Sequence, residues 1–132
     1  MKAHKILIVE DSLLLHRMYQ LILLPLTDYQ GKLLHAYDAE QALSLLEQHS
    51  DIALIILDTT LPRMSGFEFL RISKQKPLVK DIPVVVVSTE GKQEHIQRGL
   101  EAGAYAYITK PFQPYRLQDL VGTIFQLRAA NA

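Results

Sequence analysis

The chain has 132 residues, and its 14 lysine and arginine residues balance 14 aspartate and glutamate residues, so the formal net charge is zero. This balance argues against a general nucleic-acid-binding or anionic membrane-binding surface. The length predicts one domain, residues 1–132, with its own hydrophobic core. The chain has no cysteine, which excludes disulfides and thiolate chemistry. No apolar run is long enough for a secretory signal or a membrane-spanning helix, so a cytoplasmic protein is expected.

Apolar runs and helix-capping residues alternate along the chain and predict five strands and five helices. In chain order these are a strand at residues 5–9, a helix at 13–24, a strand at 32–37, a helix at 39–49, a strand at 52–57, a helix at 67–74, a strand at 83–87, a helix at 92–101, a strand at 104–109 and a terminal helix around 117–127. Ser12 is a suitable N-cap for the first helix, which Pro25 ends. Asp38 and Gln41 form a capping-box variant that opens the second helix.

The fourth predicted helix has few residues that can anchor it. Its large apolar side chains are Ile96 and Leu100, and Gly99 lies between them in the sequence. We therefore expect this helix to be the most loosely packed of the five. Gly103 is expected to follow its last turn as the residue with a left-handed backbone conformation.

Strict alternation of strand and helix predicts an α/β protein with a doubly wound parallel sheet. The simplest arrangement for this length is flavodoxin-like, (βα)5, with strand order 2-1-3-4-5 and right-handed crossovers. In that order the first and third strands are neighbours at the point where the strand order reverses. Open α/β sheets bind ligands there, beyond the carboxyl ends of the strands.

Four charged side chains stand at carboxyl ends of predicted strands. Glu10 and Asp11 follow the first strand, Asp58 follows the most apolar strand, and Lys110 follows the fifth. Clustered carboxylates repel one another, and a divalent cation such as magnesium, or manganese in its place, removes that conflict. Asp11 and Asp58 are the expected direct ligands. Glu10 would bind directly or through water, and the backbone carbonyl of Thr60 would fill a further position.

A phosphoryl-transfer site fits this arrangement. With the metal in place, one oxygen of Asp58 is free to accept a phosphoryl group as an acyl phosphate. The metal and Lys110 would balance the charge on the phosphoryl oxygens, and Ser88, at the end of the fourth strand, would donate a hydrogen bond. Taken singly, each residue has a simpler explanation, because acids after strands and at helix starts are common. The combination at four strand ends favours the functional interpretation.

Other catalytic motifs are missing from the sequence. It contains neither of the common glycine-rich phosphate loops and no G-x-S-x-G motif. The histidines show no metal-ligand spacing, so surface or sheet-edge positions are expected for them. They are His4, His16, His35, His49 and His95.

Four segments of the chain resemble the receiver domain of two-component response regulators, and the chain length resembles that of the single-domain, chemotaxis-type members. The segments are residues 6–12, 57–66, 83–88 and 101–112, in the order and spacing of that family. The resemblance implies that Asp58 accepts a phosphoryl group from a phosphohistidine on a sensor histidine kinase or a histidine phosphotransfer protein. It implies a signalling phosphoacceptor rather than an enzyme.

The same resemblance assigns metal and switch roles. The metal site would consist of Asp11, Asp58 and the Thr60 carbonyl, with Glu10 assisting through water. Lys110 would contact the phosphoryl group and Ser88 would be the switch hydroxyl. Tyr107 would be the switch aromatic, which turns inward when Ser88 moves, and a cis peptide is implied between Lys110 and Pro111. A downstream protein would bind the fourth helix, fifth strand and fifth helix, and the charges on that face allow either a monomer or a weak dimer.

Three alternatives stay open. In the first, the chain is a phosphorelay intermediate or a receiver cut from a longer regulator. The end of the sequence at Ala132 leaves no room in it for an effector domain after the last helix. A haloacid dehalogenase-like phosphohydrolase also uses a strand-end aspartate and magnesium. That class usually has a cap domain and a second aspartate two residues later, where this chain has Thr60. The last is a scaffold that is never phosphorylated, which the intact acidic residues and Lys110 argue against.

Overall fold

The structure, a computed structural model, describes residues 5–23, 25–26 and 32–130, with side chains to residue 126. The elements are β1 (Lys5–Val9), α1 (Leu13–Leu23), β2 (Leu33–Ala36), α2 (Ala39–Gln48), β3 (Ile52–Asp58), α3 (Gly66–Lys74), β4 (Val84–Ser88), α4 (Gln93–Glu101), β5 (Ala106–Thr109) and α5 (Pro114–Ala130). Every predicted element is present. The ends differ most at α5, which begins at Pro114 because proline suits the first helical turn. No helix in the described ranges has the length and apolarity needed to cross a membrane.

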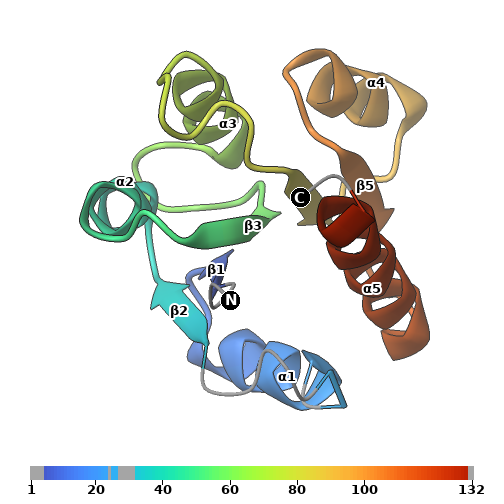
Figure 1. Cartoon of the computed structure of the whole chain (residues 1–132). Helices are drawn as coiled ribbons and strands as arrows, with labels where there is room; N and C mark the ends of the chain where they lie inside the picture. Colours follow the sequence, from blue (N-terminus) through green and yellow to red (C-terminus); the bar gives the residue numbers. More distant parts are fainter. Residues whose placement is uncertain (1–4, 24, 27–31, 131–132) are drawn as a thin grey trace.

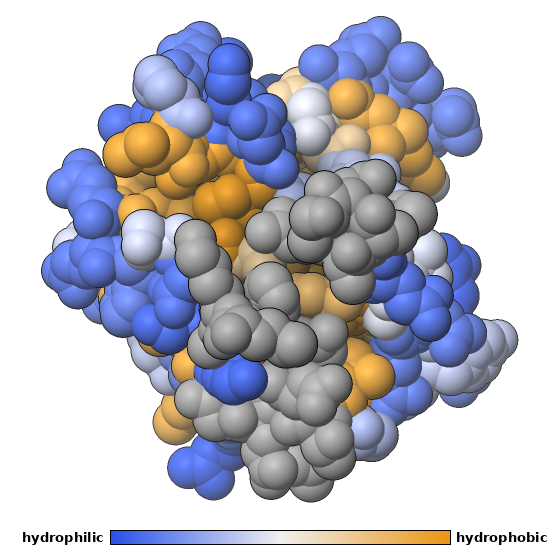
Figure 2. Space-filling view, in the orientation of Figure 1, coloured by the Kyte–Doolittle hydropathy of each residue, from blue (hydrophilic) through white to orange (hydrophobic). Residues whose placement is uncertain are grey.

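The strands form one parallel sheet in the order β2-β1-β3-β4-β5. This confirms the predicted flavodoxin-like, doubly wound fold. Helices α1 and α5 cover one face of the sheet, and α2, α3 and α4 cover the other (Figure 1). On the side shown in Figure 2, hydrophilic residues lie on the outer surfaces of the helices and hydrophobic residues gather between them.

The two central strands are buried along their whole length. Every residue of β3 and β4 is buried, which explains why both read as continuous apolar runs without alternation. Alternate side chains enter two separate hydrophobic cores. Ile56 and Val87 pack on the side of α1 and α5, whereas Leu57 and Val86 pack on the side of α2 and α3.

Capping residues define two helix starts as predicted. The backbone N–H of Leu15 donates to the Ser12 hydroxyl at 3.3 Å, and that of Gln41 donates to Asp38 at 2.7 Å. Each bond satisfies an amide that has no partner within its helix. One further prediction, Leu24 as the end of the first helix, lies outside the described part of the chain.

Helix α4 is loosely anchored, as expected, but one predicted anchor was wrong. Its one buried residue is Gly99, and Leu100 is 42% exposed. The helix is turned so that Gly99, rather than Leu100, lies against the sheet. A Cβ on Gly99 would lie 3.0 Å from a ring carbon of Tyr107, so the absence of a side chain allows this approach. Gly103 follows the helix with φ +112°, as predicted.

Candidate functional site

Three carboxylates meet at the carboxyl edge of the sheet. Glu10 and Asp11 follow β1, and Asp58 is the last residue of β3. Since β1 and β3 are hydrogen-bonded neighbours, carboxylate oxygens of all three lie within 4.8 Å of one another. Glu10 and Asp58 are buried, at 1% and 7% exposure, whereas Asp11 is exposed. The site is therefore open to solvent on the side of Asp11.

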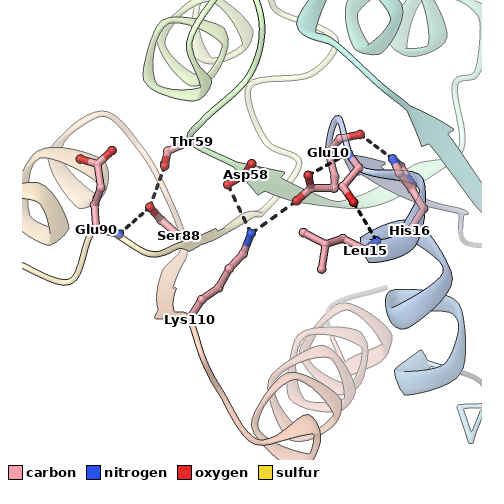
Figure 3. A network of polar contacts seen from close by, with 9 residues as sticks. Glu10, Leu15, His16, Asp58, Thr59, Ser88, Glu90 and Lys110 are labelled. Carbon is pink, nitrogen blue, oxygen red and sulfur yellow. Dashed lines mark hydrogen bonds and ion pairs between the residues drawn. The ribbon is translucent and has the colours of Figure 1, made fainter.

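Lys110 supplies a positive charge to this cluster. Its Nζ lies 3.4 Å from Glu10 Oε1 and 3.5 Å from Asp58 Oδ1 (Figure 3). Lys110 follows β5, and its backbone N–H donates to the carbonyl of Ser88 at 2.7 Å. The peptide between Lys110 and Pro111 is cis, as the resemblance implied. One lysine against three carboxylates leaves the cluster with an excess of negative charge.

Ionisation of Glu10 and Asp58 is unfavourable when no cation is bound beside them. Burial, and then the neighbouring Asp58, raise the pKa of Glu10 to about 7. Burial also raises the pKa of Asp58, although the Lys110 charge and the N–H of Thr60 act in the opposite direction. A hard divalent cation removes this conflict, and oxygen donors with open positions for water and phosphate are what magnesium prefers. The donor set fits that metal.

Thr60 follows β3 by two residues and is exposed. Its backbone N–H faces the Asp58 carboxylate, which places it at the rim of the cluster. The role of its carbonyl as a metal ligand stays a prediction.

Ser88 ends β4 and is fully buried. Its hydroxyl lies 2.7 Å from the hydroxyl of Thr59 and accepts the backbone N–H of Glu90 at 3.0 Å (Figure 3). Sequence reasoning did not single out Thr59. The pairing of the strands would have indicated Thr59. Asp58 pairs with Val87, so the next residues, Thr59 and Ser88, lie side by side.

Tyr107 joins the same network from β5. Its hydroxyl donates to the backbone carbonyl of Glu90 at 2.7 Å, and the Glu90 carboxylate lies 2.9 Å from Nδ1 of His95 on α4. Glu90 thus contacts Ser88, Tyr107 and His95 through its amide, carbonyl and carboxylate. This gives a continuous path of polar contacts from the end of β4 to α4.

His16 is buried beside the acidic cluster, so the expectation that the histidines occupy the surface or sheet edges was wrong for it. Its Nε2 lies 2.6 Å from the backbone carbonyl of Glu10, and its Nδ1 lies 2.6 Å from Nδ1 of His35 on the edge strand β2. His49 and His95 are half-buried, and His4 lies outside the described residues.

The comparisons with known proteins agree on one family. A family model described as response regulator receiver domain matches residues 6–122. The phosphate regulon transcriptional regulatory protein PhoB of Klebsiella pneumoniae is 39% identical over 117 residues, which cover 87% of this chain and 48% of PhoB. A chemotaxis protein CheY homolog of Campylobacter jejuni is 32% identical over 123 residues, covering 90% of this chain and 93% of the homolog. The chain thus spans about half the length of the PhoB relatives that it matches.

Solved structures give the same result. The chemotaxis response regulator CheY4 of Vibrio cholerae superposes with a TM-score of 0.82 at 28% identity, covering 93% of this chain and 99% of CheY4. A putative response regulator from Chloroflexus aurantiacus superposes with a TM-score of 0.83 at 31% identity, covering 93% and 98% of the two chains. The chain belongs to the receiver domain family of two-component response regulators.

Proposed function

We propose that this receiver is a signalling phosphoacceptor in which Asp58 takes up a phosphoryl group in a magnesium-dependent reaction. The observation that carries the proposal is the cluster itself. Carboxylate oxygens of Glu10, Asp11 and Asp58 lie within 4.8 Å of one another, and Lys110 Nζ is 3.5 Å from Asp58. The family to which the chain belongs supports a signalling role over catalytic turnover.

The chemistry follows from these side chains. A carboxylate oxygen of Asp58 attacks the phosphorus of a phosphohistidine, the phosphorus–nitrogen bond breaks, and an acyl phosphate forms. Asp11, Asp58 and the Thr60 carbonyl would hold magnesium or manganese, with Glu10 assisting through water. The bound cation supplies positive charge next to the phosphoryl oxygens. Lys110, which follows β5 at the same edge of the sheet, supplies a second positive charge.

The switch that we propose begins at Ser88. The new phosphoryl oxygens are strong acceptors, and Ser88 would leave Thr59 to donate to them. Ser88 is linked through Glu90 to Tyr107, so its movement would alter the packing of Tyr107 under α4. This shifts a pre-existing equilibrium rather than creating a new fold. A downstream protein would read the change at the face formed by α4, β5 and α5.

The phosphodonor that we propose is a sensor histidine kinase or a histidine phosphotransfer protein. An apolar groove of about 770 Å³ lies between α1 and the segment that follows β5. Its walls include Leu14, Leu21, Phe112 and Lys110, and Leu14 and Leu21 are 75% and 72% exposed. Because Lys110 also contacts Asp58, a protein that presents a phosphohistidine to Asp58 would cover this groove.

The wider context stays a proposal. One domain spanning residues 1–132 is favoured by the CheY homolog, of which the match covers 93%. A receiver from a longer regulator is favoured by PhoB, of which the match covers 48%. The phosphorelay intermediate stays a prediction. The cytoplasmic location and the monomer or weak dimer stay predictions. The family match and the fold give no support to the haloacid dehalogenase alternative.

Beryllofluoride, which mimics a phosphoryl group on a carboxylate, tests the proposal without depending on the lifetime of an acyl phosphate. Fluorine NMR of the protein with beryllium, fluoride and magnesium should show signals of the bound species, and these should be absent for Asp58→Asn. Folded wild-type protein that shows no bound signal with magnesium present would contradict the proposal.

A further inference from the structure

We propose that His16 and His35 are positioning residues for the divalent-cation site. They hold the backbone carbonyl of Glu10 and thereby fix the corner of the chain that carries Glu10 and Asp11. This inference rests on the proposed function, because it assigns a purpose to contacts beside the proposed metal ligands.

The hydrogen atoms of the two imidazoles follow from their partners. A carbonyl oxygen only accepts, so Nε2 of His16 carries a hydrogen and donates to Glu10 at 2.6 Å. In the neutral ring Nδ1 of His16 is then an acceptor, and Nδ1 of His35, 2.6 Å away, must be the donor. Nε2 of His35 is left as an acceptor and faces the side-chain amide of Gln20 at 3.4 Å. The donors therefore run in one direction, from Gln20 through both rings to Glu10.

The surroundings of His16 enclose this chain of bonds. The ring of Tyr37 lies 4.3 Å from that of His16 and closes one side of it. His16 is 1% exposed, so water does not replace its partners.

Glu10 is held at four places, and His16 supplies one of them. Its backbone N–H donates to Ala36 of β2 at 3.0 Å. Its carboxylate accepts the backbone N–H of Ser12 at 3.0 Å and faces Lys110 at 3.4 Å. The carbonyl, which leads into Asp11, is held by an imidazole rather than by the neighbouring strand. Loss of that bond would free the peptide that joins the two acidic residues while the sheet stays paired.

Residues that hydrogen-bond to metal ligands fix the orientation of those ligands. Their loss typically lowers metal affinity about 10- to 100-fold. We therefore expect His16→Leu and His35→Leu to weaken magnesium binding about tenfold, measured by titration calorimetry well below the unfolding temperature. His16→Gln keeps an N–H at the Nε2 position and should restore affinity to within about threefold of wild type. His49→Leu is the matched control, because His49 contacts Lys5 at the other end of β1, and it should bind magnesium like wild type.

Nitrogen-15 NMR of the imidazoles tests the hydrogen-bond chain without any metal. His16 should be the Nε2–H tautomer and His35 the Nδ1–H tautomer. His35 should lose that preference in His16→Leu, since its acceptor is gone. The opposite tautomers in wild type would overturn the assignment.

The calorimetric outcomes separate this inference from the proposed function. Equal magnesium affinity in wild type and folded His35→Leu overturns the positioning role, even if His16→Leu fails to fold. A wild-type protein that binds no magnesium overturns the proposed function, together with the purpose assigned here to the pair. Weakened binding in both leucine variants, with recovery in His16→Gln, supports the positioning role.

Discussion

The ring of Tyr107 occupies the space that a side chain on Gly99 would need. A Cβ built on Gly99 would lie 3.0 Å and 3.2 Å from two ring carbons of Tyr107. The ring cannot give way freely, because its hydroxyl is hydrogen-bonded to the carbonyl of Glu90. Helix α4 and the proposed switch aromatic are therefore in direct contact through a residue without a side chain.

This contact predicts different effects on stability for alanine substitutions at two helical glycines. Nothing lies within 4 Å of a Cβ on Gly122 of α5, so Gly122→Ala should stabilise the protein by about 0.5–1 kcal/mol through helix propensity alone. Gly99→Ala should gain less than this, or destabilise, because the added methyl presses on Tyr107. Urea unfolding of both variants measures the difference. Equal gains would show that the space above Tyr107 is open.

The pH dependence of stability should depend on the cation. A carboxyl whose pKa is raised by folding stabilises the fold below its unfolded pKa and loses that contribution as pH rises through its folded pKa. For Glu10 the window runs from 4.5 to about 7, and the size is on the order of 3 kcal/mol. Without a divalent cation, the free energy of unfolding should therefore fall across this window, and added magnesium should remove the fall.

The control for this prediction is Glu10→Gln. His16 and His35 have lowered pKa values, so their contribution has the opposite sign and is lost as pH falls below about 6.5. The glutamine variant keeps the histidine effect and lacks the glutamate effect. Urea unfolding with EDTA should show stability falling between pH 4.5 and about pH 7 in wild type relative to Glu10→Gln. Parallel curves would contradict the raised pKa.

Removal of Lys110 should separate metal binding from phosphorylation. Lys110 lies against Glu10 and Asp58, where its charge opposes a cation and favours a phosphoryl group. Lys110→Ala should bind magnesium as tightly as wild type or several-fold more tightly, by the loss of one like charge, and should be phosphorylated more slowly. Calorimetry and the rate of phosphorylation by acetyl phosphate measure the two effects. Loss of magnesium binding would show that Lys110 organises the site rather than serving the phosphoryl group.

Two leucines test the proposed donor surface. Leu14→Glu places a charge in the apolar groove beside Lys110, so phosphotransfer from a histidine kinase should fall at least tenfold. Phosphorylation by acetyl phosphate should stay unchanged, since a small donor needs no docking surface. Leu78→Glu is the matched control, because Leu78 is 95% exposed and lies before β4, away from the site. Equal kinase rates for both variants would contradict the proposed surface.

The sequence predicted those features that depend on strand order alone. The carboxyl ends of parallel strands lie at one edge of the sheet. The positions of Glu10, Asp11 and Asp58 at the ends of apolar runs were therefore enough to predict that they lie close together. Features that depend on register or helix rotation were missed. The contact of His16 with His35 needs the pairing of β2 with β1, in which His35 lies opposite Ile8. The spacing of Ile96 and Leu100 places both on one face of α4 and predicted both as anchors. In the structure Gly99 packs against Tyr107 instead, and Leu100 is left exposed.

Intact mass spectrometry after treatment with acetyl phosphate tests the central claim most directly. Wild-type protein with magnesium should gain the mass of one phosphoryl group. The gain should disappear with EDTA or hydroxylamine and should be absent in folded Asp58→Ala. A gain of the same size in Asp58→Ala, or folded wild-type protein that binds beryllofluoride at a residue other than Asp58, would contradict the assignment of Asp58 as the phosphoacceptor.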